Sequence, residues 1–141
     1  MRIEINRIDK DFHFEAFGST NVPVNIDTAP AIGGNNNGAR PMELLLMGLG
    51  GCSAIDIVNI LKKQKQPIDK FKIVIDAERE KDKTPSIFES ITIHFYLFGK
   101  LDKQKVERAV ELSMEKYCSA AAVIGKSVKI NYGFSVNDSE N

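Results

Sequence analysis

The sequence contains few cysteines, few histidines and no excess of charge of either sign. Its 19 basic and 19 acidic side chains cancel, and no basic stripe with interleaved aromatic residues occurs, so neither a nucleic acid nor an anionic membrane surface is an expected partner. The opening residues alternate, carry charges and contain no apolar signal core, which predicts a cytoplasmic protein. In such a reducing compartment, two cysteines are better interpreted as reactive thiols than as a structural disulfide.

The signals of metal sites and nucleotide sites are also missing. His13 and His94 occur singly on predicted strands, and nothing gives metal-ligand spacing, so neither a metal site nor a cofactor is expected. Gly33 and Gly34 are not part of a GxGxxG pattern and no lysine follows them, which argues against a phosphate-binding loop. No internal repeat is evident, and 141 residues with 43% hydrophobic content predict one domain, residues 1–141.

A long apolar stretch, residues 38–61, predicts a central helix. Pro41 suits the first helical position, and Glu43 lies in the first turn, where the helix dipole favours an acid. The uncharged run between Glu43 and Asp56 is only 12 residues long, so we expect a core helix and not a membrane span. No face of this helix is consistently polar, so it needs cover on nearly all sides. The rest of the chain supplies too little cover, which predicts a homodimer with a large shared core.

The other elements follow from strand alternation, helical spacing and turn residues. They are short antiparallel strands within 2–26, an irregular loop at 27–40, a hairpin of strands around 71–77 and 91–97, an amphipathic helix capped by Asp102, a short helix at 119–124 and a last strand at 128–136. This order predicts an α+β fold in which helices pack on antiparallel sheet.

Cys52 lies in the middle of the central helix, directly after a glycine-rich segment. Gly48 precedes it by four residues and therefore lies beside it, which leaves open space over the sulfur where a small molecule could fit. The alternative is tight helix packing around an inert thiol. Asp56 follows Cys52 by four residues on the same face, where a carboxylate disfavours a thiolate unless a cation neutralises it. An ion pair with a basic residue of either subunit would resolve this conflict.

Cys118 is the second thiol of the chain. A thiol that reduces a peroxide must be ionised and reachable, and it benefits from a second thiol that traps the sulfenic acid. Cys118 begins a short helix, whose backbone N–H groups are expected to lower its pKa. Because a separation of 66 residues proves nothing about contact, two unpaired core cysteines are the alternative to a redox pair.

Two runs of residues resemble the OsmC/Ohr superfamily: RPMELLLMGLGGC, from Arg40 to Cys52, and EKYCS, residues 115–119, ahead of the terminal strand. The resemblance implies an OsmC-like fold with antiparallel sheets packed around a long central helix, in an intertwined homodimer with sites at its interface. It also implies reduction of organic hydroperoxides, with Cys52 as the nucleophile and Cys118 as the resolving thiol. A dithiol, often a protein-bound lipoyl group, would then reduce the disulfide.

The residues that would activate Cys52 depart from the best-known branch of this superfamily. That branch uses an arginine from the N-terminal region and a glutamate directly after the proline, whereas Met42 follows the proline here. Glu43 precedes Cys52 by nine residues, roughly 180° around a helix, so an interaction with the helix N-terminus is an equal alternative to a catalytic role. Arg40 is the better candidate cation and Arg7 the weaker. Arg40 and Glu43 are thus the candidate substrate-binding residues.

Two functions of other classes stay open. One is a noncatalytic protein that binds a small apolar ligand in a pocket beside Cys52. The other is a thiol redox sensor that changes its contacts and does not turn over. Steady-state consumption of peroxide separates a peroxidase from both.

Overall fold

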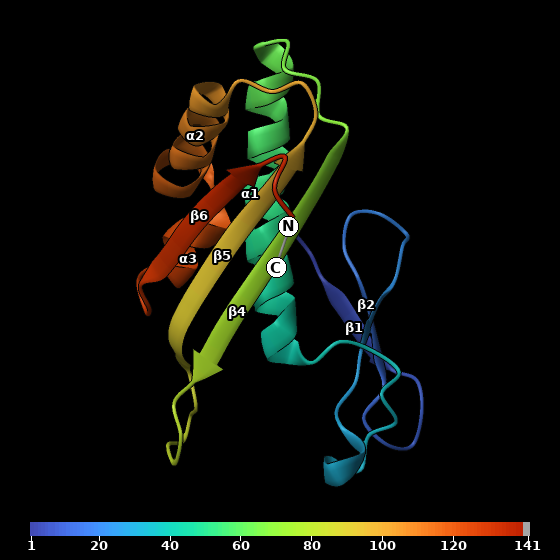
Figure 1. The fold of residues 1–141 in the computed structure, drawn as a ribbon. Coiled ribbons are helices and arrows are strands. Elements are labelled where there is room, and N and C mark those ends of the chain that lie inside the picture. Colours follow the sequence, from blue (N-terminus) through green and yellow to red (C-terminus); the bar gives the residue numbers. More distant parts are fainter. Residues whose placement is uncertain (140–141) are drawn as a thin grey trace. The chain divides into compact units, whose positions relative to one another are not determined.

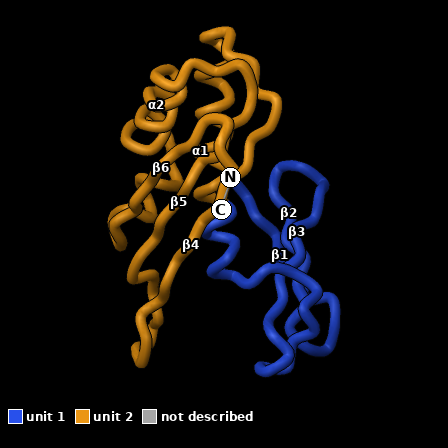
Figure 2. Tube along the Cα trace, in the orientation of Figure 1, with its two compact units in different colours: residues 1–47 blue, residues 48–141 orange. Residues whose placement is uncertain are grey.

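The computed structural model describes residues 1–139, which fall into two compact units, Met1–Met47 and Gly48–Asn141 (Figure 2). Residues 140 and 141, at the end of the expected single domain, lie outside the described part. The single-domain organisation stays a prediction, and each unit is described by itself.

The first unit is built on a three-stranded antiparallel sheet, whose strands are labelled in Figure 2. Its strands are β1 (Glu4–Arg7), β2 (Phe14–Phe17) and β3 (Val24–Ile26), which pair in chain order and confirm the predicted meander.

The loop after β3 is more ordered than its composition suggests. It contains a single 3-10 turn, Pro30–Ile32, and it is organised by the buried carboxylate of Asp27. That carboxylate accepts hydrogen bonds from the backbone N–H groups of Asn37 at 2.9 Å, Thr28 at 2.7 Å and Asn35 at 3.1 Å. These donors, Asn37 first among them, hold the pKa of Asp27 below its ordinary value.

The central helix α1 runs from Pro41 to Lys63 and begins at the predicted residue. In the second unit its buried side is a single stripe of residues, Leu49, Gly50, Ser53, Ile57 and Leu61. A Cβ added at Gly50 would lie 3.1 Å from Cδ1 of Ile75 on β4, so this glycine permits close packing of helix on sheet. Ile55 and Val58 stay 72% and 41% exposed. Within the second unit this helix therefore packs through one side, whereas the sequence predicts cover on nearly all sides.

By length and composition alone, α1 is the one helix of the described residues that could cross a membrane. In its most apolar window 28% of the residues are buried inside the protein. Core helices of soluble proteins meet the same criteria, and the stripe of α1 that packs on a sheet favours this interpretation.

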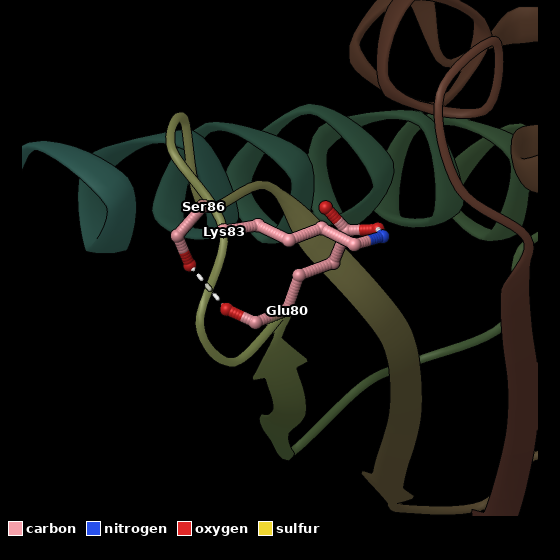
Figure 3. A network of polar contacts seen from close by, with 3 residues as sticks. All are labelled: Glu80, Lys83 and Ser86. Carbon is pink, nitrogen blue, oxygen red and sulfur yellow. Dashed lines mark hydrogen bonds and ion pairs between the residues drawn. The ribbon is translucent and has the colours of Figure 1, made fainter.

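The sheet of the second unit contains β4 (Lys70–Arg79), β5 (Phe88–Phe98) and β6 (Ile130–Val136). The first two strands form the predicted antiparallel hairpin. In the loop that joins them, the Ser86 hydroxyl donates to the Glu80 carbonyl at 2.7 Å, and Lys83 Nζ lies 2.7 Å from Glu80 Oε1 (Figure 3).

One prediction about this sheet is wrong, because β6 pairs parallel to β5. The chain leaves β5, passes through α2 (Lys103–Leu112), a π-helical turn (Ser113–Tyr117) and α3 (Ser119–Ile124), and only then enters β6. Such a helical crossover returns the chain to the same end of the sheet, and the next strand therefore runs parallel.

The core of this unit lies between the sheet and the helices, which share one face of it (Figure 1). Alternate residues of β5 supply the sheet side of the core, and all are fully buried: Ile91, Ile93, Phe95 and Leu97. On the helix side, Asp102 caps α2 as predicted, accepting from the N–H groups of Gln104 and Lys105. The predicted α+β class is confirmed.

Candidate functional site

The structure brings the two thiols together. The Sγ atoms of Cys52 and Cys118 and a carboxylate oxygen of Asp56 all lie within 4.8 Å of one another. Both cysteines are free thiols; Cys52 is partly exposed, whereas Cys118 is buried, with 3% of its surface exposed. All three side chains belong to the second unit, so their arrangement is internal to that unit.

Cys118 reaches this position through the π-helical turn. The buried face of α2 continues into Ser113, and the Cys118 N–H then donates to the Ser113 carbonyl, five residues back, at 2.8 Å. This wider turn inserts one residue into the helical repeat, a device that is frequent at functional sites. Tyr117 ends this turn and is 50% exposed, whereas Ser113 at its start is fully buried.

Cys118 is also the N-cap of α3, and its sulfur accepts a hydrogen bond from the Ala121 N–H at 3.3 Å. The sequence predicted that the N–H groups at this helix start lower the pKa of the thiol, and they do act in that direction, but the net shift is upward. Burial raises the pKa of Cys118 to about 11, and the neighbouring Cys52 acts in the same direction. The N–H groups of Ala121 and Ala120 oppose the shift without overcoming it.

This pKa predicts an order of alkylation. In the native protein at neutral pH, iodoacetamide should label Cys52 well before Cys118, because Cys118 is buried and stays a neutral thiol until the pH approaches about 11. Peptide mass spectrometry over time measures both rates. Equal labelling of the two cysteines at neutral pH would contradict the prediction.

The raised pKa of Cys118 also makes the stability of the folded state depend on pH. The pKa of Cys118 is about 11 in the folded protein and 9.0 for an ordinary cysteine thiol, so Cys118 favours the folded state below pH 9. That contribution is lost as the pH rises from about 9 to about 11.

Asp56 has a neutral partner. The Ser113 hydroxyl, fully buried, lies 3.2 Å from Asp56 Oδ2 and 3.2 Å from the Ser53 carbonyl, and its single proton is donated to one of them at a time. No ion pair recorded within residues 1–139 includes Asp56, so the ion pair suggested by the sequence has no counterpart in the described chain. Sequence reasoning missed this role of Ser113, although a hydroxyl in the apolar stripe of α2 was an available signal.

A groove of about 550 Å³ lies beside the carboxylate of this site. It is lined by residues of α1, of the turn directly after it and of the segment before Cys118: Asp56, Asn59, Ile60, Lys63, Gln64, Leu112 and Tyr117. Asp56 is thus shared between the groove and the pair of thiols. On the N-terminal side of Cys52, a Cβ added at Gly48 or Gly51 would meet nothing within 4 Å, which agrees with the predicted open space.

The candidate substrate-binding residues make local contacts. Glu43 Oε2 accepts a hydrogen bond from the Arg40 backbone N–H at 2.9 Å, which is the N-terminal helix interaction that the sequence offered as the alternative. The Arg40 guanidinium donates to the Gly38 carbonyl at 3.1 Å and to Asn36 Oδ1. Arg7, the weaker candidate, donates to backbone carbonyls of the turn after β1. A substrate-binding role for Arg40 and Glu43 stays a prediction.

Comparison with known proteins identifies the family. The family model described as OsmC-like protein matches residues 33–133, a range that contains both cysteines. The chain belongs to the OsmC-like family. Among curated relatives, Protein YhfA of Escherichia coli strain K12 is 43% identical over 97 residues, which are 68% of this chain and 72% of YhfA.

Solved structures share the OsmC-like fold over nearly the whole chain. A hypothetical protein from Aquifex aeolicus VF5 is 32% identical, with a TM-score of 0.79 and 97% of both chains covered. The organic hydroperoxide resistance protein OhrB of Bacillus subtilis is 20% identical, with a TM-score of 0.66, and the match covers 95% of this chain and 96% of OhrB. At that identity the likeness to OhrB concerns the fold alone.

Proposed function

We propose that this OsmC-like protein reduces organic hydroperoxides through Cys52 and Cys118 and so protects the cell against oxidative stress. The observation that carries the proposal is the approach of two free thiols, whose sulfurs and the Asp56 carboxylate lie within 4.8 Å of one another. Membership of the OsmC-like family and a fold shared with an organic hydroperoxide resistance protein support it.

Exposure assigns the two roles. Cys52 is partly exposed and can meet a peroxide, whereas Cys118 is shielded and suits a thiol that reacts second. In the first step the Cys52 thiolate attacks the distal peroxide oxygen, the O–O bond breaks, and the alkoxide takes up a proton and leaves as an alcohol. Cys52 is left as a sulfenic acid, oxidised by two electrons.

In the second step Cys118 attacks the sulfenic sulfur. An S–S bond forms, the S–O bond breaks, and the hydroxide leaves as water after taking the proton of the Cys118 thiol. The sulfurs need to approach from within 4.8 Å to about 2.05 Å, a local movement of two side chains. A dithiol reductant of the cytoplasm, such as a protein-bound lipoyl group, then restores both thiols and is itself oxidised to a disulfide.

The surroundings of Cys52 favour an organic substrate over hydrogen peroxide. Space is open beside Gly48 and Gly51 on a helix whose other side chains are mostly apolar. An alkyl or fatty-acid chain of a hydroperoxide can lie along such a surface and lose contact with water, an advantage that hydrogen peroxide lacks.

The direct test is peroxide consumption. Reduced protein mixed with an organic hydroperoxide should consume one peroxide for each pair of thiols, and a dithiol should make the reaction catalytic. Titration of free thiols then distinguishes the outcomes. Two free thiols that survive an excess of hydroperoxide would reject the proposal.

We also propose that the active form is a homodimer. Apolar residues of α1 stay uncovered in the single chain, Ile55 at 72% and Val58 at 41%, and an apolar surface of this kind gains by pairing with a second copy. Light scattering at micromolar concentration should give the mass of two chains, about twice the 15.7 kDa of one. A monomeric species there would contradict the proposal.

The position of Asp56 favours a second candidate function for the protein, one without catalysis. It places a carboxylate beside the thiols with no ion pair within the described residues, and such a charge opposes the formation of a thiolate. A protein that binds a small apolar ligand, or a redox sensor that reacts once, tolerates this arrangement. Native mass spectrometry would reveal a copurified ligand, and oxidation without turnover would indicate a sensor.

A further inference from the structure

The site that holds the two thiols contains the donor atoms of a metal centre. The prediction of no metal site rests on two single histidines and on the lack of metal-ligand spacing in the sequence. Both histidines are engaged elsewhere, His13 with Asn25 at 2.8 Å and His94 with Ser135 at 2.7 Å. The structure instead places two sulfurs and one carboxylate oxygen within 4.8 Å of one another. Thiolate and carboxylate ligands together fit zinc, a cation of borderline softness.

We infer that the reduced protein binds one thiophilic divalent cation of the zinc class through Cys52 Sγ, Cys118 Sγ and the Asp56 carboxylate. Zn–S bonds of about 2.3 Å place two tetrahedral sulfur ligands about 3.8 Å apart, so the two sulfurs, which lie within 4.8 Å, need to approach by at most about 1 Å. Three protein ligands leave a fourth position for water. The inference goes beyond peroxide reduction and does not depend on it.

The backbone presents these ligands as a chelating set. Cys52 and Asp56 stand at positions i and i+4 of α1, the spacing by which two ligands on one helix face reach the same metal ion. Cys118 supplies the third ligand from the start of α3, on a separate segment of the unit. Ligands from two rigid elements fix the geometry better than three ligands on one flexible loop.

A second layer of hydrogen bonds already orients two of the ligands. The Ala121 N–H donates to Cys118 Sγ at 3.3 Å, and the buried Ser113 hydroxyl lies 3.2 Å from Asp56 Oδ2. Such outer partners hold ligand atoms in place and tune metal affinity. Neither bond needs to break when the cation binds, because sulfur and carboxylate oxygen each keep further lone pairs.

The negative charge of the three ligands and their access to solvent both favour binding of a cation. A bound cation displaces the thiol protons, and the ligand set of two thiolates and one carboxylate then carries three negative charges, which the ion pairs Arg2–Glu4, Lys83–Glu80 and Arg108–Glu111 do not offset. A divalent cation removes most of the repulsion between these charges. It also supplies the neutralising cation that the sequence analysis predicts beside Asp56. Solvent reaches this cluster at Cys52, which is partly exposed, and at Asp56, which lines the groove with Asn59 and Tyr117.

The test uses the intact, fully reduced protein without peroxide, with Co²⁺ as an optical probe and Zn²⁺ as its competitor. One equivalent of Co²⁺ should bind and produce thiolate-to-cobalt charge-transfer absorption, and Zn²⁺ should displace it. Cys52→Ser, Cys118→Ser and Asp56→Asn should each weaken binding more than about 100-fold, and Ser113→Ala, which removes only an outer partner, about 10-fold. Asp76→Asn, an exposed carboxylate on β4, is the matched control and should bind like the native protein.

Circular dichroism of each variant separates loss of a ligand from loss of the fold. Absence of a stoichiometric complex in the folded native protein would overturn the inference. So would unchanged affinity in Cys118→Ser or Asp56→Asn, or an equal loss in Asp76→Asn. Because no peroxide is present, failure here leaves peroxide reduction untouched, and failure of peroxide reduction leaves this result standing.

Discussion

Replacement of Cys52 by serine is expected to reduce hydroperoxide turnover to the uncatalysed rate. A serine hydroxyl stays protonated at neutral pH and is a far weaker nucleophile towards peroxide oxygen than a thiolate, so the first step has no substitute. Cys118 cannot take over, because it is 3% exposed and its pKa is raised to about 11. The measurement is steady-state consumption of an organic hydroperoxide with a dithiol as reductant.

Ser53→Ala is a matched control for this variant. Ser53 is the next residue of α1, and its hydroxyl donates to the Leu49 carbonyl at 2.8 Å within the same helix. Its loss removes one oxygen atom beside the site and no group assigned to the reaction, so turnover should stay near the native rate. Native turnover in Cys52→Ser would show that the nucleophile is another group.

The local parts of the fold were predictable from sequence. Strand alternation in β4 and β5, Asp102 as the cap of α2 and Pro41 as the start of α1 all depend on residues close together in the chain. The direction of β6 depends instead on how a crossover of two helices and a turn returns to the sheet. Periodicity shows that a strand exists and says nothing about which neighbour it pairs with.

The chemistry of the site was predictable only in part. The i, i+4 relation of Cys52 and Asp56 follows from helix geometry, whereas the approach of Cys118 depends on a π-helical turn without a known sequence signal. The resemblance to the OsmC/Ohr superfamily predicts the pairing of Cys52 with Cys118, which their separation in the sequence does not. The sequence predicted the direction in which the helix start shifts the pKa of Cys118, but it could not show the burial of the thiol, which has the larger effect.

Replacement of Cys118 by serine is expected to stop the reaction after its first step. Cys52 should still reduce one equivalent of hydroperoxide, because attack on the peroxide needs no second thiol. Without a sulfur within 4.8 Å, the sulfenic acid cannot condense to a disulfide and therefore persists. Dimedone, a reagent for sulfenic acids, should label Cys52 in this variant, with mass spectrometry as the readout.

The native protein is the control for this experiment, carried out without reductant. It too consumes one equivalent, but it should end as a disulfide that resists dimedone, since the neighbouring thiol reacts first. Labelling of the sulfenic acid tests the role of Cys118 better than the steady-state rate does. An added dithiol can itself reduce a sulfenic acid and so restore turnover without Cys118. Equal dimedone labelling of the native protein and of Cys118→Ser would show that Cys118 does not resolve the sulfenic acid, however close the two sulfurs lie.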